Sequence, residues 1–371
     1  MTSKLSSLCS YVKEKISTKT LSRQNYISTE NMMPNKGGIV GANSLPSIPY
    51  TQQYAKGDVL FSNIRPYFKK IWIAENDGGC SNDVLVFRAV HGCDPTFLYY
   101  VLSSNAFFDY ATATAKGTKM PRGDKAAIMQ YEVPCFDYET QLRIGKLFKC
   151  FDDRIVTNQK INDNLLQQAQ ALFKSWFVDF EPFSNQKPSD WSVSTLGNVS
   201  IMGAGGDKPQ NVSPIKSNLC QYPIYSNGLS EEGLYGFTDK PKIFKESVTV
   251  SARGTIGFVC LRHIPYVPIV RLVTLIPKTE IISAKYLYLW LKQLHITGTG
   301  TTQQQLTVPD FRKTEILVPS QEIVTLFTAT VEPIFKKIWA NQNENEKLSS
   351  LRDTLLPKLM SGELDVSDID L

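Results

Sequence analysis

Histidine is scarce in this sequence, and cysteine follows no metal-binding or disulfide pattern. The 371 residues include three histidines, His91, His263 and His295, whose wide separation lacks the spacing of a metal site. The seven cysteines contain no Cys-x-x-Cys pair, and an odd number of them in a chain of this length indicates reduced thiols. We therefore expect neither a bound metal nor a cofactor, and a cytoplasmic location.

Long apolar runs are also missing. The N-terminal stretch MTSKLSSLCSYVKEK contains no apolar core of the kind that a secretory signal needs. The most apolar run, Tyr266–Pro277, is short and contains Arg271, whereas a membrane-spanning helix needs about 20 apolar residues. We expect no membrane span.

The motifs of common nucleotide-dependent enzymes are missing as well. The segment DPTF at 94–97 differs from an adenine-methyltransferase motif because threonine replaces the second proline, and GTIG at 254–257 lacks the helix that follows a dinucleotide-binding turn. No Walker A sequence is present, and VPDFRKTE at 308–315 lacks the Glu-x-Lys partner of a nuclease site. We expect no catalytic residues in this chain.

Positive charge is gathered in two blocks of similar length. Residues 1–140 carry 15 Lys or Arg against 12 Asp or Glu, and residues 187–320 carry 14 against 9. Residues 321–371 are acidic, with 5 against 9. Two basic blocks are typical of two modules that meet a polyanion, although a random surface distribution explains the charge equally well by itself.

Two segments that lie 179 residues apart share a heptad pattern. Along 144–176 and again along 323–355, mostly apolar residues recur at alternating spacings of four and three around a polar middle. The polar residues are Asn158 and Asn162 in the first segment, and Lys337 and Asn341 in the second. The apolar positions that we predict to form a coiled-coil core are Ile144, Phe148, Phe151, Ile155, Leu165, Leu172, Ile334, Leu348, Leu351 and Leu355.

The blocks outside the two heptad segments have mixed character. Runs rich in valine and isoleucine predict strands, and longer apolar-periodic runs predict short helices. The expected strands are Asp83–Phe87, Val248–Ser251, Phe258–Leu261 and Ile269–Ile276, and the expected helices are Thr96–Tyr110 and Ser283–Leu294. The chain therefore reads as domain, helix, domain, helix, with segments 1–140, 141–183, 184–320 and 321–371.

Loops recur along the chain together with the helices. FSNIRP at 61–66 matches VSARGT at 250–255, and AKGTKM at 115–120 matches GTGTTQQQL at 298–306. These matches predict an α/β mixed fold in which two α+β domains form an internal repeat with a pseudo-two-fold relation.

Geometry favours antiparallel pairing of the two long helices. The first heptad segment spans 33 residues, or about 50 Å of helix. A compact domain of about 130 residues has a radius of gyration near ~14 Å, so it joins two neighbouring helix ends more easily than two distant ones. We therefore predict two domains at opposite ends of an antiparallel rod about 50 Å long, which equals about 15 base pairs of B-DNA.

The first long helix ends in a cluster of aromatic residues, ALFKSWFVDFEPF at 171–183. Such side chains have to be covered, either by this chain or by another protein. Because large aromatics commonly anchor protein interfaces, we predict that Trp176, Phe177 and Phe180 take part in docking a partner.

Three segments carry a resemblance to a known family. They are FDDRIVTNQKINDNLLQQAQALFKSWFVDFEPF at 151–183, LVPSQEIV at 317–324 and LRDTLLPKLMSGEL at 351–364. The sequence resembles the specificity subunits of type I restriction–modification systems over essentially its whole length. The resemblance implies two target recognition domains that each read half of a bipartite DNA site. It also implies helices that bind two modification methyltransferase subunits, in a complex with restriction and translocase subunits.

Basic residues in the two domains are the candidate DNA contacts. The segment KGTKMPRGDK at 116–125 places four cations in ten residues, where lysine suits phosphates and arginine suits guanine. A solvated charged loop is the alternative interpretation. The predicted DNA-binding residues are Arg65, Lys69, Lys70, Lys116, Lys119, Arg122, Lys125, Lys208, Lys240 and Arg253. Gln303, Gln304 and Gln305 are candidates for adenine recognition.

These observations favour a non-catalytic subunit that gives a DNA-modifying complex its sequence specificity. The second hypothesis is a coiled-coil adaptor whose end domains bind proteins. Ionic strength separates the two, because neutralising several phosphates makes DNA binding strongly salt-dependent.

Overall fold

The computed structural model describes residues 2–298 and 305–366. The chain forms two compact units: residues up to Gln159 together with those from Gln342 onward make unit 1, and Lys160–Asn341 make unit 2. Within the described residues, no helix is both long and apolar enough to cross a membrane.

Two long helices contribute to both units. Helix α4 (Tyr138–Phe177) has 40 residues and helix α8 (Gln321–Ser361) has 41. In unit 1, Asp152 bonds Arg352, and Asn158, further along α4, bonds Asn345. As the residue number rises along α4, the residue number of its partner on α8 falls. The helices are therefore antiparallel in this unit, as predicted.

Unit 2 shows the same direction of pairing. Asn341 donates a hydrogen bond to Asn162, and Phe177 packs on Phe327 with ring centroids 4.8 Å apart. The higher-numbered residue of α4 again contacts the lower-numbered residue of α8. Each unit therefore contains one end of an antiparallel helix pair.

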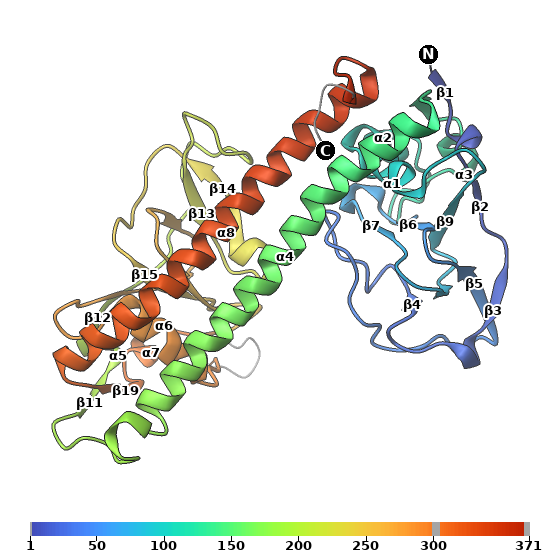
Figure 1. Cartoon of the computed structure of the whole chain (residues 1–371). Helices are drawn as coiled ribbons and strands as arrows, with labels where there is room; N and C mark the ends of the chain where they lie inside the picture. The colour runs from blue at the N-terminus through green and yellow to red at the C-terminus, as the bar shows by residue number, and fades with distance from the viewer. Residues whose placement is uncertain (1, 299–304, 367–371) are drawn as a thin grey trace. The chain divides into compact units, whose positions relative to one another are not determined.

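Within its described residues, unit 1 holds three small sheets and three short helices (Figure 1). Its strands are β1 (Thr2–Lys4), β2 (Cys9–Tyr11), β3 (Lys15–Ser17), β4 (Tyr26–Ile27), β5 (Tyr50–Tyr54), β6 (Val59–Ser62), β7 (Ile71–Ile73), β8 (Gly78–Cys80), β9 (Val84–Ala89) and β10 (Glu132–Pro134). Its short helices are α1 (Pro95–Ser103), α2 (Asn105–Ala113) and α3 (Lys125–Ile128). The strand orders are β2-β9-β6-β7, β3-β5-β8-β4 and β1-β10.

Unit 2 is built from comparable pieces. Its strands are β11 (Ser192–Thr195), β12 (Ser200–Ala204), β13 (Tyr222–Tyr225), β14 (Leu234–Thr238), β15 (Ser247–Val250), β16 (Val259–Arg262), β17 (Val267–Pro268), β18 (Val273–Pro277) and β19 (Glu315–Val318). Its short helices are α5 (Leu196–Val199), α6 (Ala284–Gln293) and α7 (Val308–Phe311). The strand orders are β12-β18-β15-β16, β14-β13-β17 and β11-β19.

The two units share the topology of their four-stranded sheet and of two further strand pairs. The four-stranded sheet β2-β9-β6-β7 corresponds strand for strand to β12-β18-β15-β16, and all pairs in both sheets are antiparallel. The parallel pair β4 and β8 corresponds to β13 and β17, and the pair β1 and β10 corresponds to β11 and β19. This confirms the predicted internal repeat of mixed α/β character.

The core of each unit combines side chains of its sheet, its short helices and both long helices. In unit 1, Phe61 and Phe97 share a core with Phe148 of α4 and Leu356 of α8. In unit 2, Tyr286 of α6 packs with α4 and α8 in the same manner. Burial of each such side chain stabilises a unit by about 1.5–3 kcal/mol, so neither core is complete without both long helices.

Candidate nucleic-acid interface

Two loops that the sequence marks as cationic meet in unit 1. They are the turn at 63–70, which follows the central strand β6, and the loop at 116–125, which leads into α3. The Arg65 N–H donates to Pro121 O at 2.8 Å, and the Gly123 N–H donates to Asn63 O at 3.1 Å. A Cβ on Gly123 would lie 2.9 Å from Asn63 Oδ1, so a larger residue where the loops touch would have to displace this side chain. We call the two segments the unit 1 loop pair.

Two of the cations in the loop at 116–125 are held by carboxylates. The exposed ammonium of Lys116 pairs with Asp124, which also caps α3 by accepting the N–H groups of Ala126 and Ala127. The hydrogen bond from Lys116 is the main reason that the pKa of Asp124 is below its usual range, and the two N–H groups add to it. Arg122 Nη2 lies 2.9 Å from Asp83 Oδ1, at the start of β9.

The remaining two cations of this loop are open to solvent. Lys119 and Lys125 are both exposed. Their ammonium groups make no ion pair or hydrogen bond with the part of the chain that the structure describes. Free lysines on a braced loop suit contacts with phosphate oxygens, because such contacts need charge and little geometric precision.

The turn at 63–70 is tightly folded. Arg65 and Lys69 both have left-handed backbones, with φ values of 51° and 53°, on either side of the one-turn 3₁₀ helix Pro66–Phe68. Lys69 Nζ donates to Asn105 Oδ1 at 2.8 Å, and Lys70 Nζ donates to Thr29 O at 2.6 Å. Burial lowers the pKa of Lys70. The sequence-predicted Lys69 and Lys70 are thus engaged within unit 1.

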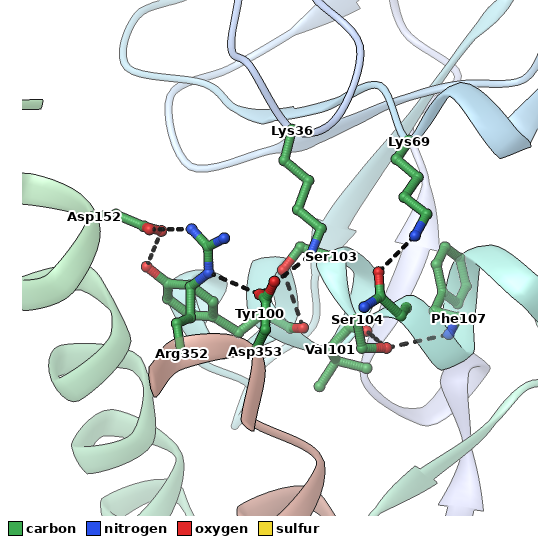
Figure 2. A network of polar contacts seen from close by, with 11 residues as sticks. Lys36, Lys69, Tyr100, Val101, Ser103, Ser104, Phe107, Asp152, Arg352 and Asp353 are labelled. Carbon is green, nitrogen blue, oxygen red and sulfur yellow. Dashed lines mark hydrogen bonds and ion pairs between the residues drawn. The ribbon is translucent and has the colours of Figure 1, made fainter. Parts of the chain in front are cut away.

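The loop at 33–38 connects this turn to the long helices, a link that sequence reasoning missed. Lys36 N–H donates to Lys69 O at 2.8 Å, while Lys36 Nζ lies 3.8 Å from Asp353 of α8. Figure 2 shows that this contact adjoins a second group in which Arg352 Nη1 and Tyr100 Oη both bond Asp152 of α4, at 2.6 and 2.7 Å. The burial of Lys36 lowers its pKa.

Unit 2 contains a matching loop pair. The segment that follows the central strand β15 meets the segment that follows Gln305, because Leu306 N–H donates to Ala252 O at 3.0 Å. The exposed Arg253 Nη2 donates to Gln305 Oε1 at 3.0 Å. Ala252 N–H in turn donates to Asn227 Oδ1 at 2.7 Å. We call these segments the unit 2 loop pair; Gln303 and Gln304 lie outside the described residues.

Lys208 and Lys240 lie on other loops of unit 2. Lys208 follows β12, and Lys240 follows β14; both are exposed. No hydrogen bond among the described residues links either lysine to Arg253. Beside Lys240, a hydrogen bond from Asn211 is the main cause of the lowered pKa of Asp239. The structure therefore does not gather these two predicted residues into the unit 2 loop pair.

The aromatic cluster at the end of α4 is largely internal. Phe177 is 2% exposed and lies in the core of unit 2, which excludes the predicted partner contact at this residue. It lies one helical turn after Phe173, on the same face, and this spacing directs both rings inward. Trp176 and Phe180 are half-buried against the core, on Phe327 and Trp191 respectively.

The first heptad segment points mostly inward. Ile144 and Phe148 are buried in the core of unit 1, and Phe151 packs at its edge. Ile155 is half-buried. Leu165 and Leu172 pack on the core of unit 2.

The second heptad segment follows a shifted pattern. Ile334 packs on the core of unit 2, Leu348 is half-buried and Leu355 packs on the core of unit 1. Leu351, however, is 49% exposed and is no core residue, because its neighbour Arg352 turns inward to Asp152. The seam of α8 runs through Val324, Phe327, Val331, Ile334, Ile338, Asn341, Asn345, Leu348, Arg352 and Leu355, so its spacing starts with three and not with four. Phe335, Leu356 and Leu359 are buried beside this seam.

The polar middle of the helix pair is a hydrogen-bonded layer in each unit. In unit 1, Asn158 Nδ2 donates to Glu344 and Asn345. In unit 2, Asn341 Nδ2 donates to Asn162 Oδ1 at 2.8 Å. Lys337, predicted for this layer, is exposed, because Ile338 takes the inward position.

The residues that the structure describes contain no group of three or more His, Cys, Asp or Glu side chains able to hold a metal ion. What the fold and the loops define is an internally repeated protein. In each unit a mixed α/β fold joins a cation-bearing loop pair to one end of an antiparallel helix pair.

Comparisons with known proteins agree with this architecture. Residues 188–350 match the type I restriction modification DNA specificity domain. The chain is 26% identical to the type I restriction enzyme MjaIX specificity subunit of Methanocaldococcus jannaschii, over 85% of this chain and 79% of that protein. It is 27% identical to the HindI specificity subunit of Haemophilus influenzae, over 91% and 94% of the two chains.

A solved structure shows the same fold. The crystal structure of the type I restriction–modification S subunit from M. genitalium matches 97% of this chain and 96% of its own, with a TM-score of 0.57 at 18% identity. Residues 188–350 thus carry a type I restriction–modification DNA specificity domain, and the chain resembles specificity subunits of these systems over most of its length.

Proposed function

We propose that this chain is the subunit that selects the DNA sequence in a type I restriction–modification complex. The domain at 1–140 reads one half of a bipartite site, and the domain at 184–320 reads the other. The observation that carries the proposal is the repetition of the loop pair: each unit joins the segment after its central strand to a second polar segment. Two reading surfaces of related fold suit two separate half-sites.

The helices at 141–183 and 321–371 dock two methyltransferase subunits in this proposal. Several apolar side chains on or next to α4 and α8 support it, because they remain exposed although they belong to otherwise well-packed helices. They are Val156 and Val178 at 46% exposure each, Leu351 at 49% and Leu326 at 55%. Exposed apolar residues of this kind suit interfaces with a partner protein.

The complex also includes restriction and translocase subunits, and it acts in the cytoplasm. This chain contributes recognition and no chemistry: it binds no cofactor and carries no catalytic residue. The methyltransferase subunits supply the reaction at adenine. The curated relatives support this role, since both are specificity subunits of type I restriction enzymes by name.

Co-expression with the cognate methyltransferase tests the proposal. Methylated adenines mapped across the host genome should fall in one sequence with two defined parts and an undefined spacer. Omission of this chain should abolish the methylation. Methylation that persists without it, or that follows one continuous sequence, would contradict the bipartite reading.

Salt dependence separates this function from a protein adaptor. A subunit that neutralises six or more phosphates loses about 10³-fold or more in affinity for duplex DNA between 50 and 200 mM salt. Retention of the complex on a DNA column should therefore fall steeply over this range. Retention that does not depend on salt, or no retention at all, would favour the adaptor.

A further inference from the structure

The turn after β6 contains a positive charge without a carboxylate partner. Arg65 is half-buried, its Nε is buried without a hydrogen bond, and its guanidinium carbon lies 6.0 Å from the ring centroid of Phe68. Other arginines of unit 1 that turn inward are paired, Arg88 with Asp58 and Arg352 with Asp152. Among the described residues, Arg65 is the half-buried arginine that lacks a carboxylate.

A half-buried guanidinium is unfavourable until its donors meet acceptors. Within the described residues, the buried Arg65 Nε has no hydrogen-bond acceptor. The missing acceptor is therefore expected from a molecule that binds to the unit 1 loop pair. The proposed function places DNA there, and DNA carries such acceptors on its bases and phosphates.

The backbone conformation of Arg65 also supports a role of its side chain in binding. Its φ of 51° and ψ of 66° are left-handed, a conformation that glycine adopts freely and that a residue with a Cβ adopts at a cost. The neighbouring structure enforces it, because the Arg65 N–H donates to Pro121 O at 2.8 Å and the Phe68 N–H donates to Arg65 O at 2.9 Å. Glycine would fit this backbone better, so the side chain itself is the reason for arginine here.

Unit 2 has an arginine at the corresponding place. Arg65 is the third residue after β6, and Arg253 is the third residue after β15, the corresponding central strand of the repeated sheet. The guanidinium of Arg253 is steadied by Gln305 Oε1 at 3.0 Å. In unit 2 the left-handed backbone lies one residue later, at Gly254, which has a φ of 69°.

We propose that Arg65 and Arg253 each recognise a guanine, one in each half of the bipartite site. This proposal rests on the proposed function and deepens it. A guanidinium offers a planar pair of donors that matches the O6 and N7 acceptors of guanine in the major groove. Recognition of a base needs a positioned donor. The backbone of Arg65 is held by hydrogen bonds and its guanidinium lies near the Phe68 ring, whereas the free Lys119 and Lys125 suit phosphates. Arg122, paired with Asp83, braces the loop.

The test uses the complex of this chain with its cognate methyltransferase subunits. A duplex library with every position of the two half-sites randomised is methylated and sequenced. Arg65→Gly should weaken the preference for one guanine in one half-site by about 10-fold or more and leave the other half-site unchanged. Arg253→Lys should do the same in the opposite half-site.

Two further variants separate base reading from other roles. Arg65→Lys keeps the charge and loses the fork of donors, so it should lose the guanine preference while overall DNA retention stays near that of the wild type. If Arg65→Lys keeps the preference, Arg65 contacts a phosphate and the proposal is overturned. Arg23→Lys, at an exposed arginine of unit 1, is the matched control and should change nothing.

Thermal unfolding checks for a purely structural role. Because glycine relieves the left-handed backbone, Arg65→Gly should unfold at the same temperature as the wild type or higher. A lower unfolding temperature together with an unchanged base preference would overturn the proposal. The wild-type complex is measured before any variant. If it shows no preference for a bipartite sequence, the proposed function itself fails.

Discussion

At the residue scale, the structure divides the predicted cations by their partners. Lys69, Lys70, Lys116 and Arg122 are engaged inside unit 1, whereas Lys119 and Lys125 are free within its described residues. The sequence shows that cations cluster at 116–125, but it does not show which of them meet carboxylates. Asp83, the partner of Arg122, lies 39 positions earlier in the chain, and only the fold brings the two together.

This division predicts different effects for two kinds of lysine. Changing both Lys119→Glu and Lys125→Glu should weaken binding to duplex DNA at low salt and reduce the salt slope by about 2, because two phosphate contacts are lost. Base preference in both half-sites should be retained. Lys19→Glu, an exposed lysine on the one-turn helix Thr18–Thr20, is the control. An unchanged salt slope would remove the two lysines from the interface.

The aromatic cluster gives a second prediction at this scale. Phe177→Ala should lower the free energy of unfolding by about 3–5 kcal/mol, because it opens a cavity in the core of unit 2. Phe180→Ala changes a half-buried ring and should destabilise the chain much less, while it weakens co-purification of the methyltransferase. Chemical denaturation and pull-down measure the two effects. Equal methyltransferase recovery with Phe180→Ala and with the wild type would mean that Phe180 only covers Trp191.

At the scale of elements, sequence periodicity located both long helices but misplaced one helical face. Counted from Ile323, the alternating spacing of four and three predicted Thr330, Lys337 and Leu351 as inward positions, whereas Val331, Ile338 and Arg352 face inward. Val331 and Ile338 are more apolar than Thr330 and Lys337, so the sequence itself indicates this part of the shift. Arg352 is not, because its burial depends on Asp152, 200 positions away.

The short elements show the limits of local pattern in the same way. The expected helix Thr96–Tyr110 is divided at Ser104, whose hydroxyl accepts the Phe107 N–H and so starts a new helix. The expected strand Ile269–Ile276 begins only at Val273, because Val270 and Arg271 take left-handed backbones. Apolar runs predicted where these elements lie. Their ends depend on capping side chains and on contacts with distant strands.

The polar layer between the helices gives a prediction at the element scale. The double change Asn162→Leu with Asn341→Leu should raise the unfolding temperature, since it replaces a polar pair, with one buried oxygen unpaired, by an apolar one. The helix register should become less well defined. Double electron–electron resonance between spin labels on α4 and α8 should show a broader distance distribution than in the wild type. A lower unfolding temperature would show that the pair stabilises the fold.

At the scale of the whole molecule, each unit needs both helices. Unit 1 takes Leu356 and Leu359 from α8 into its core, and unit 2 takes Phe173 and Phe177 from α4. Leu356 and Leu359 lie 179 positions after Phe177 and Phe180, the offset of the heptad repeat. In the internal repeat, the end of α4 therefore corresponds to the segment of α8 that completes the core of unit 1.

This relation predicts that a chain ending near residue 186 pairs with itself. Loss of α8 uncovers Ile144, Phe148 and other core residues of unit 1. The α4 end of a second copy can cover them, and burial of each large side chain contributes about 1.5–3 kcal/mol. Sedimentation should show a dimer. With the methyltransferase, the dimer should recognise an inverted repeat.

A monomer, or a selected site without dyad symmetry, would contradict the antiparallel helix pair on which this prediction depends. The matched control is the same truncation with Phe148→Asp. This change places a charge in the surface that the second copy has to cover, so the control should not dimerise.

The dependence of unit 1 on α8 also has a consequence for biosynthesis. The first unit cannot close its core until residues through Leu359 have left the ribosome. At about 5–20 residues per second, the nascent chain carries an uncovered α4 for roughly 10–40 s after Gln159 is made. During that interval a neighbouring nascent chain on the same messenger RNA offers the same apolar surface, so translation itself is the stage at which two copies are most exposed to mispairing.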